Sequence, residues 1–370
     1  MSTHTTSSTP QPLNVAEHNV LDLSPTPQNP RNSEGDFVTL ADGRVLFAYT
    51  RFTGGGSDSA AAAIASRISD DGGRSWSGQD RVLVENEGDQ NVMSVSMLRL
   101  HDGRIALFYL RKNAVDDCLL YMRISNDEAA SFSEPRPAIA APGYFVVNND
   151  RVVQLGSGRL VVPASFKMHR PAAPRGGTSV GIARFFLSDD AGESWSEGRD
   201  WWALPVLSTS GLQEPGVIEL NDGRLWSWSR TTTGCQWAMY SHDAGDTWSP
   251  PHPTEFRSPN SPMSVKRLGD GGPLLAIWND RSDRVSHWGL DLPGPVSKER
   301  TPLVCAISRD EAVTWDDHRL IESDHERGYC YTAIHVLEDA VLLGYCAGGP
   351  EDGGLLRRLR LRRIPMEELI

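Results

Sequence analysis

The eight residues Ser69-Asp70-Asp71-Gly72-Gly73-Arg74-Ser75-Trp76 form a motif, Ser-x-Asp-x-Gly-x-Ser-Trp, that recurs along the chain. Further copies begin at Ser188 and Ser241, and two weaker copies, in which alanine replaces the glycine, begin at Ser125 and Ser308. The Asp carboxylate of such a motif accepts hydrogen bonds from turn amides, Gly adopts positive φ without strain, and the aromatic ring buries apolar area. We therefore interpret each copy as a turn, and the recurrence predicts an array of similar structural units.

A second repeated pattern places a short turn before an apolar run. The turns are Asp42-Gly43, Asp102-Gly103, Ser157-Gly158, Asp222-Gly223, Asp270-Gly271 and Asp339-Ala340. Asp-Gly between apolar strands is a strong hairpin signal. The turns follow one another at steps of 48 to 69 residues, which leaves room for four short strands in each unit. The sequence therefore predicts an all-β fold, a six-bladed β-propeller.

The two patterns also predict how the chain is divided. Residues 14–370 are expected to form one propeller domain, and residues 1–13, which are rich in Ser, Thr and Pro, a disordered tail. The segment 14–23 is expected to be a strand that closes the last blade. The third strand of the last blade is expected over 355–364, where we interpret four arginines as a solvated strand face. These arginines are Arg357, Arg358, Arg360 and Arg362.

Composition limits the classes of partner. The formal net charge of −12 argues against nucleic acid and against an anionic membrane as partners. No apolar run is long enough to span a bilayer, and no signal peptide is visible. The five cysteines are scattered without a zinc-type pair, which favours buried thiols in a reducing compartment. We therefore expect a cytoplasmic protein that uses no metal and no other cofactor.

Polar residues that a core would not favour occur where the inner strands begin and in the loops after the hairpins. Propellers carry function in these places, because the inner strands converge there on one face. The candidates are Arg31, Arg51, Asp58, Arg151, Glu214, Arg230, Arg300 and Tyr329. Taken singly, Asp58 in its Gly-rich loop is typical of a turn, Tyr329 of a strand, and the arginines of strand ends. Taken together, they indicate a site for an anionic ligand.

The chain resembles the sialidase (neuraminidase) superfamily, in which the repeated turn motif is known as the Asp-box or BNR repeat. The resemblance covers nearly the whole chain at the level of architecture. It implies a glycoside hydrolase that removes a terminal acidic sugar, such as sialic acid, so that an acidic glycan is the expected partner. Asp-boxes also occur in propellers with other roles, so they indicate the fold more strongly than the activity.

The resemblance implies a role for three of the candidates. Asp58, on the loop after the first hairpin, matches the acid/base. Glu214, in Gln213-Glu214-Pro215, matches the glutamate that activates the nucleophile, and Tyr329, in Gly328-Tyr329-Cys330, matches the nucleophile itself. Tyr331 lies two residues further on, and we expect only one of the two tyrosines to point into the site.

The arginines complete the implied site. Arg230 and Arg300 match the residues that hold the sugar carboxylate, and Arg31, Arg51 and Arg151 are weaker candidates for substrate contacts. Guanidinium groups suit this role because they stay charged and bind a carboxylate through two hydrogen bonds. A neutral phenol suits an anionic sugar better than a carboxylate nucleophile, which the sugar would repel. Tyrosine is a recognised exception to the two-carboxylate rule of glycosidases.

One segment departs from the family pattern. Sialidases carry Arg-Ile-Pro about nine residues before the first hairpin turn, where this chain reads Ser33-Glu34-Gly35, with Asp36 following and Arg31 two residues upstream. Acidic residues beside an arginine cluster would alter the selection of an anionic sugar. Two alternatives therefore stay open: a hydrolase or lyase for uronate-containing glycans, and a glycan-binding propeller without catalysis.

Overall fold

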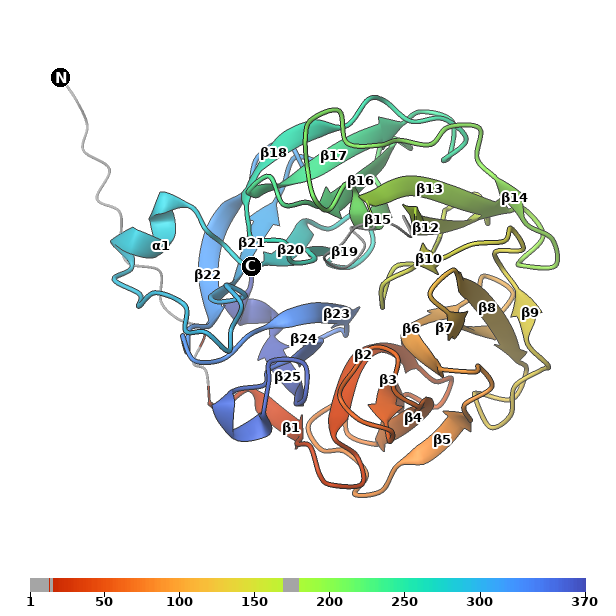
Figure 1. Cartoon of the computed structure of the whole chain (residues 1–370), viewed down its shortest axis with the longest axis horizontal. Helices are drawn as coiled ribbons and strands as arrows, with labels where there is room; N and C mark the ends of the chain where they lie inside the picture. Colours follow the sequence, from red (N-terminus) through yellow and green to blue (C-terminus); the bar gives the residue numbers. More distant parts are fainter. Residues whose placement is uncertain (1–12, 14–15, 169–179) are drawn as a thin grey trace.

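The strands of this protein form a ring of six antiparallel sheets around a central axis (Figure 1). The computed structural model describes residues 13, 16–168 and 180–370. The ring confirms the predicted six-bladed β-propeller, and the sheets follow one another around it in sequence order. Among the described residues, no helix is long and apolar enough to cross a membrane.

Each blade except the last takes its strands from one continuous stretch of chain. The first blade contains β2 (Arg31–Thr39), β3 (Val45–Phe52), β4 (Ala62–Ser69) and β5 (Arg81–Val84). The second contains β6 (Asn91–Arg99), β7 (Ile105–Ala114), β8 (Asp117–Ser125) and β9 (Arg136–Pro137). The third contains β10 (Phe145–Val146), β11 (Val153–Gln154), β12 (Leu160–Met168), β13 (Val180–Ser188) and β14 (Ser196–Glu197). The fourth blade contains β15 (Gln213–Glu219), β16 (Leu225–Arg230), β17 (Cys235–Ser241) and β18 (His252–Arg257). The fifth contains β19 (Ser264–Arg267), β20 (Leu274–Trp278), β21 (Leu303–Ser308) and β22 (Asp316–Glu322). Short helices are α1 (Asp283–His287), η1 (Pro350–Asp352) and η2 (Met366–Glu368).

The sixth blade joins two distant parts of the chain. It contains β23 (Cys330–Val336), β24 (Ala340–Cys346), β25 (Leu359–Pro365) and β1 (Asn19–Leu23). β1 pairs with β25 in antiparallel register, so the predicted closing strand is confirmed, and red and blue segments lie side by side in Figure 1. Residues 1–12 of the predicted tail lie outside the described residues. Leu13 is buried, and its amide donates to the carbonyl of Leu320.

The arginines of β25 do not form the predicted solvated face. Arg362 is fully buried, and both it and Arg360 donate to Glu322 of the fifth blade at 2.9 Å. Tyr345 donates to the same carboxylate oxygen at 2.7 Å. The prediction was wrong because a charged residue on a blade-to-blade face can be buried when a counter-charge meets it. This cluster, Glu322 with its three donors, ties the closing strand to the preceding blade.

The repeated motif forms self-contained turns, as the sequence predicts. In the first copy, Ser75 donates to Asp71 through its amide at 2.9 Å and its hydroxyl at 2.6 Å. The hydroxyl of Ser69 donates to the same carboxylate and accepts from the amide of Gly73. These bonds, the Ser75 hydroxyl bond first, lower the pKa of Asp71 to about 2. The turns are therefore structural.

Three consecutive residues hold the inner strands together at the axis. Asn149 donates to the carbonyls of Gly35 and Tyr331, at 2.8 and 3.0 Å. Asp150 accepts from the amide of Ile334 at 2.9 Å and pairs with Lys266. Arg151 donates to the carbonyl of Met263 at 2.7 Å. These contacts join the third blade to the first, fifth and sixth, so this segment fixes where the inner strands stand relative to one another.

We expect the Glu322 cluster to contribute strongly to stability. Glu322→Ala removes the buried carboxylate that Arg360, Arg362 and Tyr345 share between the fifth and sixth blades, which should lower the free energy of unfolding by about 3–5 kcal/mol. Guanidinium denaturation measures this change. The control is Glu193→Ala, which removes an exposed ion pair with Arg136 and should change the free energy by less than about 1 kcal/mol. Equal effects of the two variants would contradict this prediction.

Candidate active site

Irregularities of the inner strands direct polar side chains toward the axis. Five non-glycine residues there have positive φ: Glu34 (51°), Ser94 (60°), Asp150 (52°), Glu214 (47°) and Tyr331 (59°). In β2, β6, β15 and β23 the pairing register shifts at these residues, as in a β-bulge. Four of the five, all except Asp150, line one cavity. A left-handed conformation is unfavourable for these residue types, and such strain is concentrated at functional sites.

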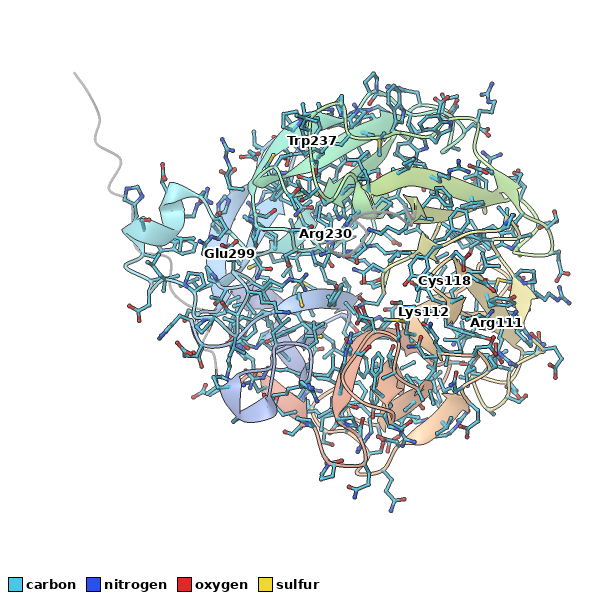
Figure 2. All side chains as sticks on the ribbon, viewed as in Figure 1. Arg111, Lys112, Cys118, Arg230, Trp237 and Glu299 are labelled. Atoms are coloured by element: carbon cyan, nitrogen blue, oxygen red, sulfur yellow. The ribbon has the colours of Figure 1, made fainter. Side chains whose placement is uncertain are left out.

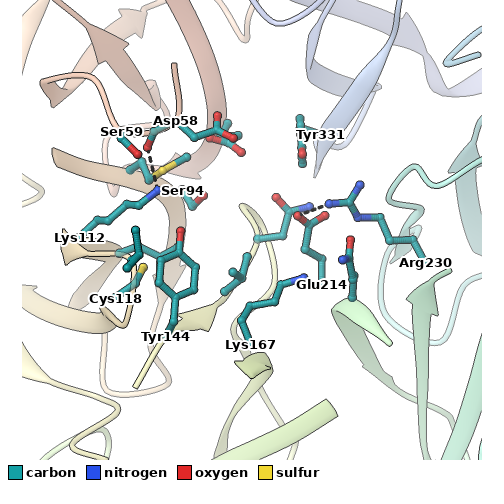
Figure 3. A pocket seen from close by; sticks show the side chains of 17 residues that line it. Asp58, Ser59, Ser94, Lys112, Cys118, Tyr144, Lys167, Glu214, Arg230 and Tyr331 are labelled. Carbon is teal, nitrogen blue, oxygen red and sulfur yellow. Dashed lines mark hydrogen bonds and ion pairs between the residues drawn. The ribbon is translucent and has the colours of Figure 1, made fainter. Parts of the chain in front are cut away.

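This cavity has a volume of about 360 Å³. Its charged and aromatic lining consists of Glu34, Asp58, Lys112, Tyr144, Lys167, Glu214, Arg230 and Tyr331. Figure 3 shows Asp58 and Lys112 facing Tyr331, Glu214 and Arg230 across the cavity, with Lys167 reaching in from below. In Figure 2, Lys112 and Arg230 lie toward the centre of the ring, whereas Trp237 and Arg111 lie nearer its edge.

Arg31 and Asp58 form an ion pair at one side of the cavity. Arg31 Nη1 lies 2.5 Å from Asp58 Oδ1, and the guanidinium stacks 4.3 Å from the centre of the Phe52 ring. The arginine side chain is buried, whereas Asp58 lies on the loop between β3 and β4. Desolvation acts to raise the pKa of Asp58, but the charge and hydrogen bond of Arg31 outweigh it, so that this pKa is lowered. Asp58 is therefore ionised while Arg31 is its partner.

Two further predicted arginines meet on the other side. Arg230 donates to Glu214 Oε1 at 2.7 Å and to the carbonyl of Asn260 at 3.0 Å. Arg300 donates to the same carbonyl at 3.3 Å and to Cys330 Sγ at 3.0 Å. Its guanidinium lies 5.3 Å from the centre of the Tyr331 ring. The second oxygen of Glu214, Oε2, is buried and has no hydrogen-bond partner among the described residues.

The tyrosine that faces the cavity is Tyr331, not Tyr329. Tyr329 is fully buried in the core between the fifth and sixth blades, where its ring packs against Tyr345. Residues two apart share a face in a regular strand, but here the register shifts between Cys330 and Ala333 and Tyr331 takes positive φ. The irregularity turns the two rings apart. Burial, and next the charge of Glu214, raise the pKa of the Tyr331 hydroxyl, which Arg230 and Arg300 oppose.

Of the predicted arginines in the described part of the chain, only Arg230 lines the cavity itself. Arg31 and Arg300 contact the lining residues Asp58 and Tyr331, whereas Arg51 and Arg151 are held elsewhere. Arg51 pairs with Asp80 at 3.3 Å, together with Arg67, and so belongs to the outer part of the first blade. Arg151 is buried at the axis, where it binds Met263 and Ser264. Both arginines are held by partners within the fold, so neither is placed to contact a ligand in this cavity.

Three charged residues of the cavity were not among the predicted site residues. Glu34 lies 3.7 Å from Arg31, and burial raises its pKa to about 8. Lys112 donates to the carbonyl of Asp58 at 3.1 Å, and desolvation lowers the pKa of Lys167 to about 8. The sequence holds a weak signal for the lysines, since each is a charged residue near the end of an otherwise apolar strand. Of the three, only Glu34 lies in the segment that departs from the family pattern.

Known proteins are similar to this chain in sequence and in fold. A family model described as a BNR repeat-like domain matches residues 50–344. The anhydrosialidase of Macrobdella decora is 29% identical over 258 residues, which cover 64% of this chain and 31% of that protein, so the match spans about a third of the relative's length.

Solved structures of sialidases share the fold at low sequence identity. The NanB sialidase of Streptococcus pneumoniae, as its K499G mutant, has a TM-score of 0.70 at 15% identity and covers 96% of this chain and 71% of its own. The leech intramolecular trans-sialidase, complexed with 2,7-anhydro-Neu5Ac, gives the same values. A protein of unknown function from Dyadobacter fermentans has a TM-score of 0.72 at 16% identity, with 94% and 98% covered.

The raised pKa of Glu34 predicts how stability depends on pH. Because the folded chain binds this proton more tightly than the unfolded chain does, the stabilising effect is complete below about pH 4.5 and is lost as the pH rises through about 8. Glu34→Gln cannot ionise, so we expect it to become increasingly more stable than the wild type over this interval. Thermal melting across the interval measures the difference. A constant difference would mean that Glu34 is ionised in the folded chain throughout.

Proposed function

We propose, for a chain that belongs to the family of BNR repeat-like domains, that it is a retaining exo-glycosidase of the sialidase type. Its substrate would be a glycan that ends in an acidic sugar, either sialic acid or a related sugar acid. The observation that carries the proposal is the cavity itself, in which Tyr331 and the buried carboxylate of Glu214 stand beside Arg230 and opposite Asp58, an acid on a loop. The names of the relatives support the same class of substrate.

In this proposal the arginines bind the carboxylate of the sugar. Arg230 and Arg300 already share the carbonyl of Asn260, so their guanidinium groups are held close to one another. Arg31 would be the third arginine that binds the substrate, and the carboxylate of the sugar would compete with Asp58 for this guanidinium. Loss of the ion pair removes the interaction that keeps Asp58 ionised, so its pKa would rise on binding. Substrate binding would thereby convert Asp58 into a proton donor.

The chemical steps then follow from the positions of the remaining groups. The Tyr331 hydroxyl oxygen attacks the anomeric carbon, its proton passes to Glu214, and Asp58 protonates the leaving oxygen as the glycosidic bond breaks. Water then attacks the anomeric carbon, and the bond between this carbon and the tyrosine oxygen breaks. Asp58 takes a proton from the water, and Glu214 returns a proton to the tyrosine oxygen. Positive charge from Arg230 and Arg300 favours the developing phenolate.

Both the product that is released and the acidic sugar that is bound can differ among enzymes of this class. A relative is named for forming an anhydro sugar, so mass spectrometry of the released sugar would distinguish a hydrated from an anhydro product. Glu34 in the cavity is the observation that favours a different acidic sugar, such as a uronate, over sialic acid. Screening of uronate-containing oligosaccharides alongside sialosides would decide between the two, and an unsaturated uronate product would indicate a lyase.

The first test compares the two tyrosines. Tyr331→Phe should reduce kcat/KM for a fluorogenic sialoside by at least about 10³-fold, because it removes the nucleophile. Tyr329→Phe is the matched control, since its hydroxyl is buried without a hydrogen-bond partner among the described residues and its loss should change kcat/KM by less than about twofold. Full activity of Tyr331→Phe would exclude this mechanism. Absence of hydrolysis by folded wild-type protein would argue against sialidase activity.

The second test concerns the acid. Asp58→Asn should slow the hydrolysis of alkyl-linked sialosides by about 10²-fold or more, because their leaving oxygen needs protonation. Aryl sialosides with acidic phenol leaving groups should be affected much less, since such phenolates depart unprotonated. Rates for a series of leaving groups, with wild type and variant in parallel, measure this contrast. A uniform loss across the series would show that Asp58 does not act as the general acid.

A further inference from the structure

Glu34 is an unusual component of a cavity that binds anions. Its side chain lines the cavity and is only 6% exposed, and within the described part of the chain its Oε2 atom has no hydrogen-bond partner. The nearest cation is Arg31, whose Nη2 lies 3.7 Å away and whose Nη1 is already paired with Asp58. The residue has φ of 51°, so the bulge in β2 aims this carboxyl group into the cavity.

The surroundings of Glu34 favour its uncharged form. Desolvation is the main cause of its raised pKa of about 8, Arg31 opposes the shift, and the charges of Asp58, Glu214 and Cys330 add to it. Tyr144 and Tyr331 line the same cavity as Glu34. A neutral carboxyl group offers one O–H donor, and the Oε2 atom of Glu34 has no hydrogen-bond partner among the described residues. A buried donor without an acceptor marks a place where a ligand can supply one.

The ligand of the proposed function has the required acceptor. A sugar carboxylate that reaches Arg31 from the cavity must also pass within reach of Glu34, because the two side chains lie side by side. An ionised Glu34 would repel that carboxylate and compete for Arg31. A protonated Glu34 would instead add a charge-assisted hydrogen bond to it. The same side chain therefore either assists or opposes binding, according to its proton.

We propose that Glu34 donates a hydrogen bond from its carboxyl group to the carboxylate of the substrate, beside Arg31, and thereby determines which acidic sugars this cavity accepts. The inference rests on the proposed function for the identity of the ligand. It does not require turnover, because it concerns binding alone. It makes Glu34 a specificity-determining residue in the segment where the sialidases carry Arg-Ile-Pro.

The test is the binding of free N-acetylneuraminic acid and of galacturonic acid, measured by calorimetry between pH 6 and pH 9. Three proteins are compared: the wild type, Glu34→Gln, which keeps a donor and cannot ionise, and Glu34→Met, which has similar size and no donor. For the acid that binds, the wild-type affinity should fall about tenfold per pH unit above about pH 8. Glu34→Gln should bind within about threefold of the wild type at pH 6 without this fall. Glu34→Met should bind about tenfold more weakly at pH 6.

Other groups that titrate in the same range remain in all three proteins. These are Lys167, with a pKa of about 8, and Cys330, with a pKa of about 7. Any fall in affinity that they cause persists in Glu34→Gln, so the difference between wild type and Gln variant isolates Glu34. Thermal melting confirms that each variant is folded.

The outcomes separate this inference from the proposed function. Equal affinities and equal pH dependence in the three folded proteins would overturn the inference, while hydrolysis of sialosides would leave the proposed function standing. The expected pattern without any hydrolysis would support the inference and count against the glycosidase. Failure of both acids to bind to folded wild type would overturn the inference together with the assignment of an acidic sugar.

Discussion

The inner strands of this propeller are held in place by one short polar segment, Asn149-Asp150-Arg151. Its side chains bind backbone groups or charges of three other blades across the axis. Backbone groups at the centre of a ring cannot all find partners within their own blades, and a buried group without a partner destabilises the fold. The segment supplies those partners. The positions of Glu34 and Tyr331 follow from it, because Asn149 bonds the carbonyls of Gly35 and of Tyr331 itself.

The cavity and the residues that border it combine groups of opposite charge that pair with one another. Asp58 pairs with Arg31 and Glu214 with Arg230, and Arg300 is held by Cys330. Such internal pairing lowers the cost of burying several charges in a small space. It also means that an anionic ligand gains less from each arginine than an isolated guanidinium would give, because an existing partner must be displaced. Selectivity then depends on how the displaced carboxylates are accommodated.

The architecture could be predicted from sequence because its signals are local. Each Asp-box and each Asp-Gly hairpin fixes its own turn through bonds among neighbouring residues, and their spacing then counts the blades. Asp58, Glu214 and Arg230 were predicted as site residues from their positions in the blades, and all three line one cavity. The placement of the other candidate residues could not be predicted, because it depends on contacts between distant parts of the chain and on local irregularities of the strands. Arg51 is held by Asp80, and Arg151 by the Met263 carbonyl and the Ser264 hydroxyl of a distant blade. The turn at Tyr331 comes from a bulge whose left-handed residue is glutamate, serine or tyrosine, depending on the blade.

Ring closure through β1 and β25 has a consequence for how the chain folds during synthesis. Asp22 pairs with Arg360, so the strand that carries Asp22 must wait until more than 330 further residues have left the ribosome. Until then the ring has two open blade edges, and unpaired edges invite association with other chains. Asp22 carries a charge on the waiting strand, where it later binds Arg360 at 2.8 Å. The same carboxylate that later fastens the ring would thus help to keep nascent chains apart.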